Sequence, residues 1–367
     1  MTFTSKEIAR YARHLSLKGF GPAAQEKLKA SRVLVIGAGG LGCPALLYLA
    51  AAGVGRMEIF DGDRVDVSNL QRQVLFTEED AGELKVEAAA RRLRALNPHI
   101  EIVPMAERFT RENALAILRD VDVVVDGSDN FATRYLVNDA CVLAGKPFAY
   151  GAIQGFEGQA SVFNWQGGPT YRCLFPEPPE PGTVPNCSEA GVLGVLPGLI
   201  GTIQATETIK LLTGIGESLS GRLLLWDALT MTTHTVKLEV DPRSREIREL
   251  PKADYGATCK MTTTPSSDEI DGGELRPLLA KVQLIDVRED WERAAGAILP
   301  SAHLPLGQLL IGSADAVVTT LNAAKPTVIY CAHGKRSLKA LDVLRARHGF
   351  TSAQSLRGGY EAWKVTG

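Results

Sequence analysis

The sequence predicts an α/β protein that folds as a doubly wound, mostly parallel sheet followed by a smaller α/β domain. Three observations lead to this prediction. A short apolar strand at residues 32–36 is followed by a helical stretch at 43–52, and the alternation continues along the chain. With 367 residues, the chain exceeds the size of one ordinary core. Near its end, a strand at 327–330 and a helix at 337–347 repeat the α/β pattern.

Changes in composition predict where the two domains end. Residues 241–267 carry prolines, charges and a Thr/Ser/Pro run typical of a linker, so we expect domains at 1–240 and 268–367. Continuous apolar runs predict strands, and Ala/Leu-rich stretches predict helices. The further elements expected are two helices within 5–30, strands at 57–60, 100–103, 121–126, 223–227 and 283–287, and helices at 85–96 and 192–212.

The bulk composition is that of a soluble globular protein, with 45% hydrophobic and 22% charged residues. A net charge of −2 and the lack of any run of Lys or Arg predict no binding to nucleic acid or to a membrane surface. No stretch reaches the ~18 apolar residues of a membrane span, and the start lacks a signal-peptide pattern. We therefore expect a cytoplasmic protein.

Cysteine spacing predicts individual thiols. None of the 6 cysteines forms a Cys-x-x-Cys pair, so a structural zinc site built from such pairs is not visible. Disulfides are not expected in a cytoplasmic chain. Most of these thiols are then inert core residues, and one or two are reactive.

A glycine-rich loop, Gly37-Ala38-Gly39-Gly40-Leu41-Gly42, follows the first predicted strand. Its glycines allow a tight turn and bring phosphate close to the backbone at the start of a helix. Asp61, at the end of the next strand, is placed to bind ribose hydroxyls. Alone, this Rossmann-like pattern fits NAD or FAD as well as another nucleotide. The chain has no G-x-x-x-x-G-K-[ST] motif, which excludes a Walker-type ATPase.

Residues downstream favour a reaction at the α-phosphate of ATP. When a carboxylate attacks that phosphate, negative charge builds up on its oxygens, and Arg, Lys and a carboxylate-bound Mg²⁺ stabilise the charge. Asp129 is the predicted magnesium ligand. Taken singly, an Arg or Lys is usually a solvated surface residue, and Asp129 could belong to a helix N-cap. The inference rests on the whole set: Ser68-Asn69-Leu70-Gln71-Arg72-Gln73, Lys85 and Asp129-Asn130.

A cysteine-centred loop lies near the end of the chain, between a strand and a helix N-terminus. Backbone N–H groups and the helix end favour an anion there, so we expect a thiolate that can carry a persulfide. Four residues separate Cys331 from Arg336, whereas Cys-based phosphatase loops need five, and the shorter loop favours sulfur. A buried structural cysteine is the simpler alternative. The loop consists of Cys331, Ala332, His333, Gly334, Lys335 and Arg336.

Residues 8–240 resemble the ubiquitin-activating-like adenylyltransferases that activate sulfur-carrier proteins. The residues that carry the resemblance are Arg10-Tyr11-Ala12-Arg13-His14, the glycine loop, Asp61-Gly62-Asp63, Ser68–Gln73, Lys85 and Asp129-Asn130. The resemblance implies adenylation of the C-terminal glycine of a small ubiquitin-like protein that ends in Gly-Gly. It also implies a homodimer in which Arg13 reaches the partner's nucleotide. The implied ATP contacts are Gly40, Asp61, Asn69, Arg72, Lys85 and Asp129.

The chain departs from this family pattern at the zinc site. Many relatives bind zinc through two Cys-x-x-Cys pairs, but here the first is reduced to Thr170-Tyr171-Arg172-Cys173, and the second region reads Asp241-Pro242-Arg243-Ser244-Arg245. We therefore predict no zinc. Cys187, at the end of a proline-rich loop, matches a position where relatives keep a cysteine that can link to the carrier. A lone loop cysteine of this kind can also be incidental.

Residues 268–367 resemble a rhodanese domain. The matching pieces are Leu284-Ile285-Asp286-Val287-Arg288-Glu289, the Cys331–Arg336 loop and Leu356-Arg357-Gly358-Gly359-Tyr360-Glu361-Ala362-Trp363. The resemblance implies that Cys331 carries a persulfide, loaded by an upstream donor such as a cysteine desulfurase. Asp286 and Arg288 are expected to fix the architecture of the domain, and His333 to be a loop residue.

Together, the two resemblances predict a fused adenylyltransferase and sulfurtransferase that makes a thiocarboxylate on the carrier for molybdopterin, thiamin or a related pathway. The predicted catalytic residues are Cys331, Cys187, Arg72, Asp129 and Arg13, and the linker is expected to let the rear domain reach the front site. Three alternatives stay open from the sequence. They are an NAD-dependent oxidoreductase with a sulfur-handling domain, a carrier-binding scaffold without catalysis, and an adenylyltransferase whose rear domain only docks partners.

Overall fold

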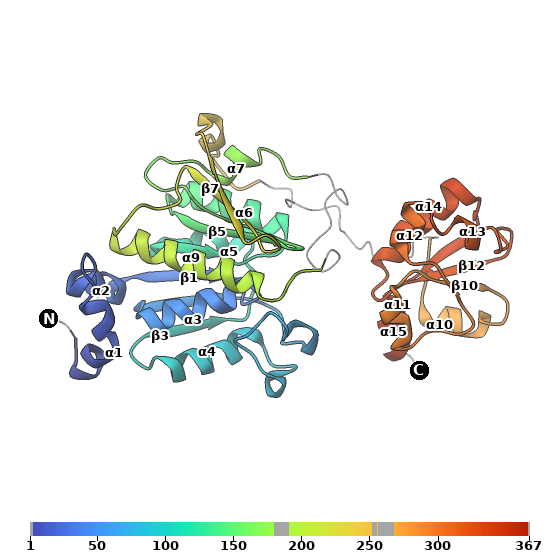
Figure 1. Ribbon diagram of the computed structural model, residues 1–367, viewed down its shortest axis with the longest axis horizontal. Helices are drawn as coiled ribbons and strands as arrows, with labels where there is room; N and C mark the ends of the chain where they lie inside the picture. The colour runs from blue at the N-terminus through green and yellow to red at the C-terminus, as the bar shows by residue number, and fades with distance from the viewer. Residues whose placement is uncertain (1–2, 180–190, 252–254, 256–267, 366–367) are drawn as a thin grey trace. The chain divides into compact units, whose positions relative to one another are not determined.

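A computed structural model describes residues 3–179, 191–251, 255 and 268–365 (Figure 1). The chain divides into two compact units, Met1–Cys259 and Lys260–Gly367. The boundaries drawn from the sequence, at 240 and 268, stay a prediction. Among the described residues, none of the helices combines the length and the apolar character needed to cross a bilayer.

The first unit is built on an eight-stranded sheet of order β3-β2-β1-β4-β5-β6-β7-β8. Its first five strands are parallel and its last three run antiparallel, which confirms the predicted mostly parallel, doubly wound class. The strands are β1 Arg32–Ile36, β2 Arg56–Phe60, β3 Glu101–Met105, β4 Val123–Asp126, β5 Phe148–Gln154, β6 Glu157–Phe163, β7 Arg222–Asp227 and β8 Thr232–Lys237.

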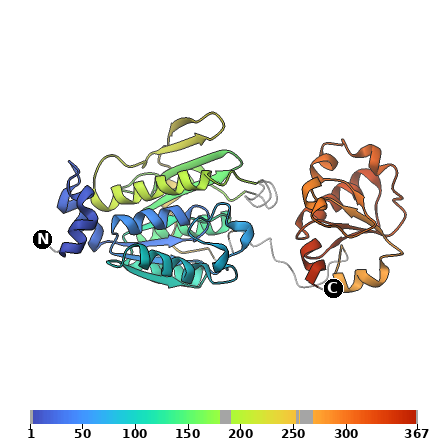
Figure 2. The ribbon, with the colours of Figure 1, turned by 60° about the horizontal axis from the view of Figure 1, so that its bottom comes forward.

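Helices cover both faces of this sheet (Figure 2). In β1, Val33 and Val35 pack with α3, α4 and α9, whereas Leu34 and Ile36 point to the other face and pack with α5 and α6. A strand buried on both faces in this way needs the continuous apolar run seen in the sequence. The helices are α1 Ser5–Leu15, α2 Gly21–Ala30, α3 Gly42–Ala52, α4 Lys85–Leu96, α5 Arg111–Ile117, α6 Phe131–Ala144, α7 Tyr171–Leu174 and α9 Leu196–Thr213.

Short 3₁₀ turns complete this unit, at η1 Val67–Asn69, η2 Glu78–Asp80, η3 Leu118–Asp120 and η4 Pro242–Arg245. Part of the stretch that the sequence marks as a linker packs onto the unit, because Ser244 and Leu250 are buried. Tyr255 packs there as well: its hydroxyl donates to Asp139 Oδ2, and its ring stacks on Tyr135. Arg172 holds both oxygens of the same Asp139 carboxylate, at 2.8 and 2.9 Å.

The second unit has a five-stranded, wholly parallel sheet of order β11-β10-β12-β13-β9. It fits the smaller α/β domain expected from the sequence. One face carries a core built around Ile329 and Leu341, and the other a core built around Val328 and Tyr330. The elements are β9 Glu269–Ile270, α10 Gly272–Leu275, η5 Arg276–Leu278, β10 Gln283–Asp286, α11 Asp290–Ala294, β11 Ala302–His303, α12 Leu306–Leu310, α13 Asp315–Val318, β12 Thr327–Tyr330, α14 Lys335–His348, β13 Ala353–Leu356 and α15 Gly359–Val365.

Helix α1 is fastened to the unit by a buried carboxylate. Glu7 closes a capping box with Thr4 and pairs with Lys29 Nζ of α2 at 2.7 Å. Burial of Glu7 opposes ionisation, but the bonds from Lys29 and Thr4 outweigh it and lower the pKa of Glu7 from 4.5 to about 2. The ionised carboxylate therefore stabilises the position of α1.

We expect Glu7→Gln to destabilise the first unit in a pH-dependent way. Because the folded pKa lies below the unfolded one, the stabilisation is complete above about pH 4.5 and falls as the pH approaches 2. The thermal unfolding midpoint of the variant should therefore lie below that of the wild type at pH 7, and the difference should shrink as the pH falls from about 4.5 toward 2. The exposed Glu107→Gln is the control. A constant difference at every pH would contradict this account.

Candidate functional site

The glycine loop lies where the strand order of the first sheet reverses, between β1 and β4. In open α/β sheets, ligands bind in the crevice outside the carboxyl ends of the strands at such a point. The backbone is packed tightly there. A Cβ added to Gly42 would lie 1.9 Å from Gly37 O, and one added to Gly37 would lie 2.8 Å from Gly127 O. Glycine is therefore required at both positions, and α3 can begin directly at the turn.

Asp61 supports this loop from the end of β2. Its Oδ2 accepts a hydrogen bond from the Ala38 N–H at 2.9 Å, and its Oδ1 accepts one from Asp63 N–H at 2.8 Å. The Lys85 side chain is only 8% exposed, and its Nζ lies 3.2 Å from Asp63 Oδ2 and 4.0 Å from Asp61 Oδ2. The structure thus brings Lys85 to the loop as a buried cation, which excludes the solvated-surface alternative for this residue.

The end of η1 and the residues that follow it place a guanidinium and two amides beside the loop. Arg72 Nη2 and Gln73 Nε2 both donate to Asn69 Oδ1, at 3.0 and 3.2 Å. Since a guanidinium can only donate, these contacts assign oxygen to the bonded side of Asn69 and leave its NH₂ group outside this pair of bonds. The Cβ positions of Gly39 and Gly40 lie 3.8 Å from Gln73 Nε2 and 3.6 Å from Arg72 Cγ.

Ser68 belongs to the same segment, but its side chain is used internally. Its Oγ donates to Asp66 Oδ1 at 2.5 Å, and its N–H donates to the same oxygen at 2.8 Å. On the other side of the loop, a Cβ on Gly40 would lie 3.1 Å from Pro197 Cβ at the start of α9. The glycine loop is therefore bordered by η1 and α9.

Asp129 and Asn130 follow β4, and the structure separates their roles. Asn130 is the N-cap of α6, where its side-chain oxygen accepts from the Thr133 N–H at 2.9 Å. Asp129 is exposed, with one oxygen 3.3 Å from Asn130 Nδ2. The N-cap alternative thus holds for Asn130, while the Asp129 carboxylate faces solvent and has room for another ligand.

A buried ion pair holds the residue just before Asp129. Asp126 Oδ1 accepts from the N–H and the Oγ of Ser128, at 3.0 and 2.6 Å, and Arg134 Nη2 donates to Ser128 O at 3.0 Å. Arg134 Nε lies 3.8 Å from Asp126 Oδ2. Burial raises the pKa of Asp126, which the Arg134 charge partly offsets. Ser128 is fixed at three atoms, and so is the start of the Asp129 side chain.

Among the described residues, no group of three or more His, Cys, Asp and Glu side chains could hold a metal ion. The Asp129 carboxylate fits Mg²⁺ as a single protein ligand. Mg²⁺ commonly binds in this way, through one or two carboxylates together with substrate phosphates and water.

The structure does not bring Arg13 to the glycine loop of the same chain. Arg13 is exposed on α1, and Tyr11 of this helix packs on Gly53, at the C-terminal end of α3. The glycine loop adjoins the opposite end of α3. Any contact of Arg13 with a nucleotide therefore has to be made in another subunit. Cys187, which is also predicted to be catalytic, lies outside the described residues.

The two stretches in which zinc ligands would be expected do lie side by side. Cys173 Sγ is 3.1 Å from Ser244 Oγ and accepts from the N–H groups of Thr170 and Asp241, both at 3.3 Å. Burial opposes ionisation of Cys173, but these bonds outweigh it and lower the pKa of the thiol. Arg245 adds bonds to Asn164 Oδ1, at 2.9 Å, and to a backbone carbonyl. This corner is thus held by hydrogen bonds.

Two further thiols of the first unit are core residues. Cys43 and Cys141 are both fully buried. Burial raises the pKa of Cys43 to about 12 and also raises the pKa of Cys141. Both side chains are therefore protonated and inert at neutral pH, as the sequence predicts for most of its cysteines.

In the second unit, Cys331 lies between β12 and α14 and is 1% exposed. Its Sγ accepts a hydrogen bond from Gly334 N–H at 3.1 Å. The loop carbonyls are occupied on the outside, because Tyr360 N–H and Glu361 N–H of α15 donate to Cys331 O and Ala332 O, at 2.7 and 3.0 Å. These two bonds explain the glycine at the start of α15, because a Cβ on Gly359 would lie 2.3 Å from Cys331 O.

The charges around this loop are paired in part. Arg336 donates from both Nη atoms to Glu292 of α11, at 2.7 and 2.5 Å, while His333 and Lys335 are exposed. Arg336 therefore acts on the sulfur with its charge largely balanced. Asp286 and Arg288 form a buried pair, at 2.8 and 2.9 Å. They lie in the framework of the domain, as expected from the sequence.

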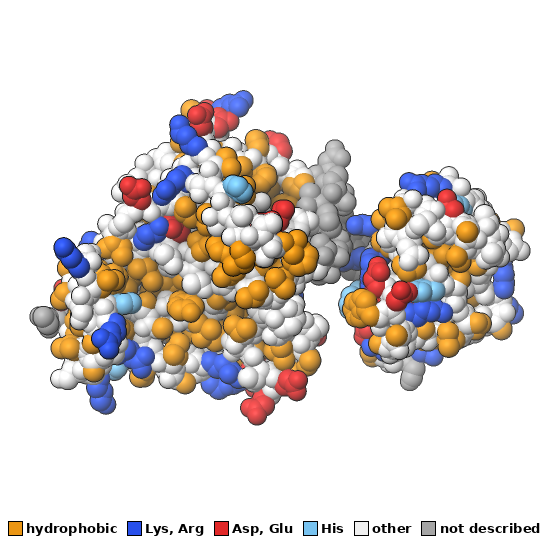
Figure 3. All heavy atoms as spheres, viewed as in Figure 1, with side chains coloured by type: hydrophobic (Ala, Val, Ile, Leu, Met, Phe, Trp, Pro, Cys, Tyr) orange, Lys and Arg blue, Asp and Glu red, His pale blue; other side chains and the backbone are white. Residues whose placement is uncertain are grey.

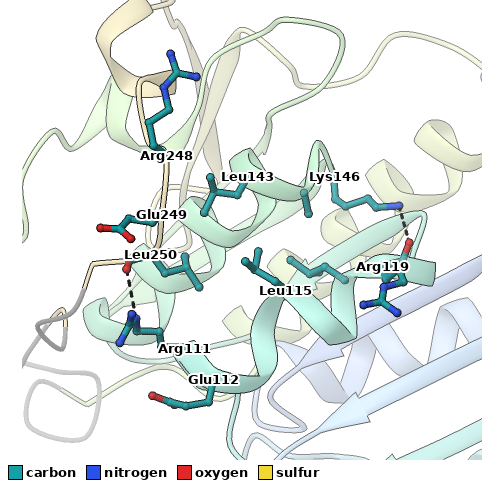
Figure 4. Close-up of a pocket in the computed structure, with 11 residues that line it drawn as sticks. Arg111, Glu112, Leu115, Arg119, Leu143, Lys146, Arg248, Glu249 and Leu250 are labelled. Atoms are coloured by element: carbon teal, nitrogen blue, oxygen red, sulfur yellow. Dashed lines mark hydrogen bonds between the residues drawn. The ribbon is translucent and has the colours of Figure 1, made fainter.

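A hollow on the first unit contains none of the predicted site residues (Figure 4). Leu115, Leu143 and Leu250 converge at its centre, while charged side chains of both signs lie at its rim. It borders the C-terminal end of α6, whereas Asn130 and Asp129 are at the other end of that helix. Its lining residues are Arg111, Glu112, Leu115, Leu118, Arg119, Leu143, Ala144, Lys146, Arg248, Glu249 and Leu250.

Comparison with protein-family models places both units. Residues 11–246 match the ThiF family, and residues 272–366 match the rhodanese-like domain. The chain belongs to the ThiF family. The ThiF domain accounts for the first unit, with the glycine loop and Lys85, and the rhodanese-like domain accounts for the Cys331 loop. Both resemblances noted in the sequence are thereby confirmed.

Curated relatives share the combination of domains. The chain is 45% identical to the probable adenylyltransferase/sulfurtransferase MoeZ of Mycobacterium tuberculosis, over 98% of this chain and 93% of MoeZ. It is 41% identical to the adenylyltransferase and sulfurtransferase MOCS3-1 of Zea mays, over 97% of this chain and 81% of that protein. This ThiF–rhodanese protein is an adenylyltransferase and a sulfurtransferase.

The ThiF domain alone has relatives as well. A Thermus thermophilus protein named sulfur carrier protein adenylyltransferase is 52% identical over 71% of this chain and 100% of its own length. Among solved structures, MccB of E. coli with ATP has a TM-score of 0.55 at 24% identity, over 64% of this chain and 72% of that chain. At this identity the likeness shows the fold alone.

Several residues that shape the two sites were not found by sequence reasoning. Gln73 belongs to the Ser68–Gln73 motif, but the sequence predicts no role for it. In the structure its Nε2 donates to Asn69 Oδ1. The buried Arg134 and Ser337 and the partly buried Glu292 were not predicted as site residues. A signal existed for Ser337, which directly follows the Cys331–Arg336 loop. Glu292 lies 44 positions before its partner Arg336, and no local pattern connects them.

We expect Gly42→Ala to abolish nucleotide binding by the ThiF domain. The new methyl group would lie 1.9 Å from Gly37 O, so the turn must open and α3 must shift away from the loop. Binding of a fluorescent ATP analogue should be lost, with destabilisation on the order of 3 kcal/mol if the shift is resisted.

Gly198→Ala is the matched control. It replaces a glycine of the neighbouring helix α9 that has no atom within 4 Å of the added Cβ. Its affinity for the analogue should be that of the wild type. Unchanged affinity in Gly42→Ala would show that the loop is not the nucleotide site.

Proposed function

We propose that this enzyme adenylates the C-terminal glycine of a small ubiquitin-like sulfur-carrier protein and then transfers persulfide sulfur to it, forming a thiocarboxylate. One observation carries the proposal: the same chain joins a domain whose glycine loop is bordered by Arg72, Lys85 and Asp129 to a second domain whose loop encloses Cys331. The names of the relatives agree, since the Thermus thermophilus protein is named for a sulfur carrier and a Haloferax volcanii relative is named SAMP-activating enzyme E1.

In the first step, the carrier's carboxylate attacks the α-phosphate of ATP. A bond forms between the carboxylate oxygen and phosphorus, the bond to the bridging oxygen breaks, and pyrophosphate leaves. The proposed roles follow from position: the N–H groups at the start of α3 face the phosphates, and Arg72 and Lys85 balance the growing negative charge. Gly37, Gly39, Gly40, Asp61, Ser68 and Asn69 complete the proposed nucleotide site together with Asn130.

Mg²⁺ would be held by Asp129 and by the phosphates of ATP, and it would supply charge neutralisation at the leaving pyrophosphate. The exposed carboxylate beside the N-cap of α6 supports this assignment. We propose that zinc is not needed. The Cys173 corner is held by Ser244, Asp241 and Thr170, where the family pattern places metal ligands.

In the second step, the outer sulfur of a persulfide on Cys331 attacks the carbonyl carbon of the acyl-adenylate. A carbon–sulfur bond forms, the carbon–oxygen bond to AMP breaks, and AMP leaves. The product is still joined to Cys331 through a disulfide bond. A thiol then attacks Cys331 Sγ, and the thiocarboxylate leaves with the electron pair. We propose Cys187 for this thiol, with an external thiol reductant to reduce the resulting disulfide.

The surface of the ThiF domain supports the proposed homodimer. Helix α3 contains no charged residue and α9 contains one Glu and one Lys, yet Tyr48 of α3 and Val195, the N-cap of α9, are 57% and 60% exposed. Figure 3 shows apolar side chains gathered over these two helices on one face. Helices that are apolar on all sides are normally buried, so a second subunit is expected to cover them. A dimer would also allow Arg13 to reach the partner's nucleotide.

Partners and location complete the proposal. We propose a cysteine desulfurase as the donor that loads Cys331, no nucleic-acid or membrane partner, and the cytoplasm as the site of action. The net charge of −2 supports the absence of a nucleic-acid or membrane-surface partner. The pathway served, whether for molybdopterin, thiamin or another sulfur product, follows from which carrier is adenylated.

We expect Arg72→Ala and Asp129→Ala each to lower the rate of carrier-dependent ATP–pyrophosphate exchange by about a hundredfold or more. Each removes a charge that acts on the phosphates during adenylation, and such groups are commonly worth this much in rate. Exchange of radiolabelled pyrophosphate into ATP measures the effect. Arg111→Ala, in the hollow at the other end of α6, is the control and should exchange normally. Normal exchange in both site variants would remove the basis for this site.

We expect Cys331→Ala to leave ATP–pyrophosphate exchange intact but to block formation of the thiocarboxylate. Adenylation uses residues of the first unit only, whereas the sulfur is carried by the second. Mass spectrometry of the carrier measures sulfur incorporation, and Cys141→Ala is a control for loss of an inert thiol. Loss of exchange in Cys331→Ala would contradict the proposed division of labour.

A further inference from the structure

Two buried hydroxyl groups lie behind the sulfur of Cys331. Ser337 Oγ is 3.5 Å from Cys331 Sγ, 2.8 Å from Gly334 O and 2.8 Å from Ser355 Oγ. Ser355 Oγ is also 3.4 Å from Gly334 O. Both serines are 0% exposed. They come from α14 and β13, so the fold has brought together two residues that are 18 positions apart.

Two of the arrangements that the hydrogen count of this group permits differ in whether the sulfur receives a hydrogen bond from Ser337. Each hydroxyl has one hydrogen, so Ser337 can donate either to Cys331 Sγ or to Gly334 O, but not to both in full. Ser355 can donate to Ser337 Oγ in both cases. Rotation of the Ser337 O–H bond therefore moves its hydrogen bond between Cys331 Sγ and Gly334 O, while the bond between Ser355 and Ser337 stays in place.

We propose that Ser337 is a further catalytic residue of the sulfurtransferase unit and that Ser355 is its positioning residue. The Ser337 hydroxyl donates to Cys331 Sγ when this sulfur is a thiolate, and turns to Gly334 O when the sulfur is bonded to a second sulfur. Hydrogen bonds to charged atoms are about twice as strong as those between neutral groups, so the charge on Sγ sets the direction of the hydroxyl.

The charge on Sγ changes in every transfer. In loading, the Cys331 thiolate attacks the outer sulfur of the donor: a bond from Sγ to that sulfur forms, the donor's sulfur–sulfur bond breaks, and the donor leaves with the electron pair. The negative charge then sits on the outer sulfur. When an acceptor such as cyanide attacks the outer sulfur, the bond to Sγ breaks and Cys331 leaves as a thiolate. In the proposed transfer to the carrier, Sγ becomes a thiolate again when the disulfide with Cys187 is reduced and the Sγ–sulfur bond breaks. Ser337 stabilises Sγ as nucleophile and as leaving group.

The charged groups nearby do not replace this donor. Arg336 is bonded to Glu292 through both Nη atoms, and Glu289 lies at the start of α11. His333 and Lys335 are exposed to solvent. The Gly334 N–H points at Sγ at 3.1 Å but belongs to the backbone and cannot turn away. Ser337, by contrast, can donate to Cys331 Sγ when this sulfur is charged and to Gly334 O when it is not.

The test uses the full chain, with thiosulfate as sulfur donor and cyanide as acceptor. Cyanide attacks the outer sulfur of the Cys331 persulfide, thiocyanate leaves, and the Cys331 thiolate is restored. Protein loaded with thiosulfate and freed of excess donor is mixed with cyanide, and single-turnover thiocyanate formation is followed. In parallel, iodoacetamide labelling of the Cys331 peptide is measured against pH by mass spectrometry.

We expect Ser337→Ala to form thiocyanate about tenfold more slowly, as expected for the loss of one hydrogen bond to a charged atom. The pH midpoint of labelling should rise by about one unit. Ser355→Ala should show a smaller change in the same direction, of about threefold, because Ser337 keeps its hydroxyl but loses the donor that orients it. Ser337→Thr, which retains a hydroxyl, should recover most of the rate.

Ser301→Ala is the matched control, because its hydroxyl bonds Tyr330 and Arg293 in the same unit, away from the sulfur. It should match the wild type in both measurements. If Ser337→Ala has the wild-type rate and labelling midpoint, the two hydroxyls serve packing only and the inference is wrong. A thermal unfolding midpoint near that of the wild type, with loss of rate, separates catalysis from misfolding. The assay contains neither ATP nor carrier, so failure of the proposed adenylation would leave its outcome unaffected.

Discussion

The contact on which the ThiF domain most depends is the one between the backbones that leave β1 and β4. Gly37 and Gly127 meet there, and Gly42 packs back on Gly37 O, so that no side chain separates the two turns. This contact fixes where α3 begins and where Asp129 emerges. Asp61, at the end of the neighbouring strand β2, accepts a hydrogen bond from the Ala38 N–H of the same loop. The charges proposed to act on a nucleotide are thus arranged around three glycines that let the two turns pack together.

Both catalytic units use the same physical device at different sizes. In each, a parallel strand ends, the chain turns, and a helix begins with its free N–H groups facing the turn. In the ThiF domain residues 37–41 form the turn between β1 and α3, and its glycines let the backbone approach phosphate. In the rhodanese-like domain the turn is shorter, residues 331–334 between β12 and α14, and α15 bonds its carbonyls. The glycine-rich turn suits phosphate, and the shorter turn suits a single sulfur atom.

Features encoded by neighbouring residues could be predicted from the sequence. The family, the fold class, the two loops and the start of the helix at Lys85 follow from local patterns of glycine, apolar runs and caps. The β5–β6 hairpin was not predicted, since its apolar runs lie in no βαβ alternation. Nor was the packing of residues 241–251 on the first unit, because a composition rich in proline and charge does not reveal that Leu250 becomes buried.

Contacts between distant residues were beyond prediction for a physical reason. The sequence predicts that Asp61 binds ribose. It does not predict the hydrogen bond that Asp61 accepts from Ala38 N–H, because this bond depends on the spacing of two strands. The Glu292–Arg336 pair and the Ser337–Ser355 pair depend on the packing of separate elements. In each case the sequence shows a polar residue without a visible partner, and the partner is supplied by the tertiary fold.

The protonated state of Cys43 and Cys141 has a consequence for how the enzyme tolerates its own chemistry. Reactive sulfur species and oxidants attack thiolates far faster than thiols, so damage is directed away from the interior of the nucleotide-binding domain. Cys43 and Cys141 therefore do not compete with Cys331 for such reagents. For the same reason, electrophilic inhibitors aimed at the Cys331 loop should not label Cys43 or Cys141.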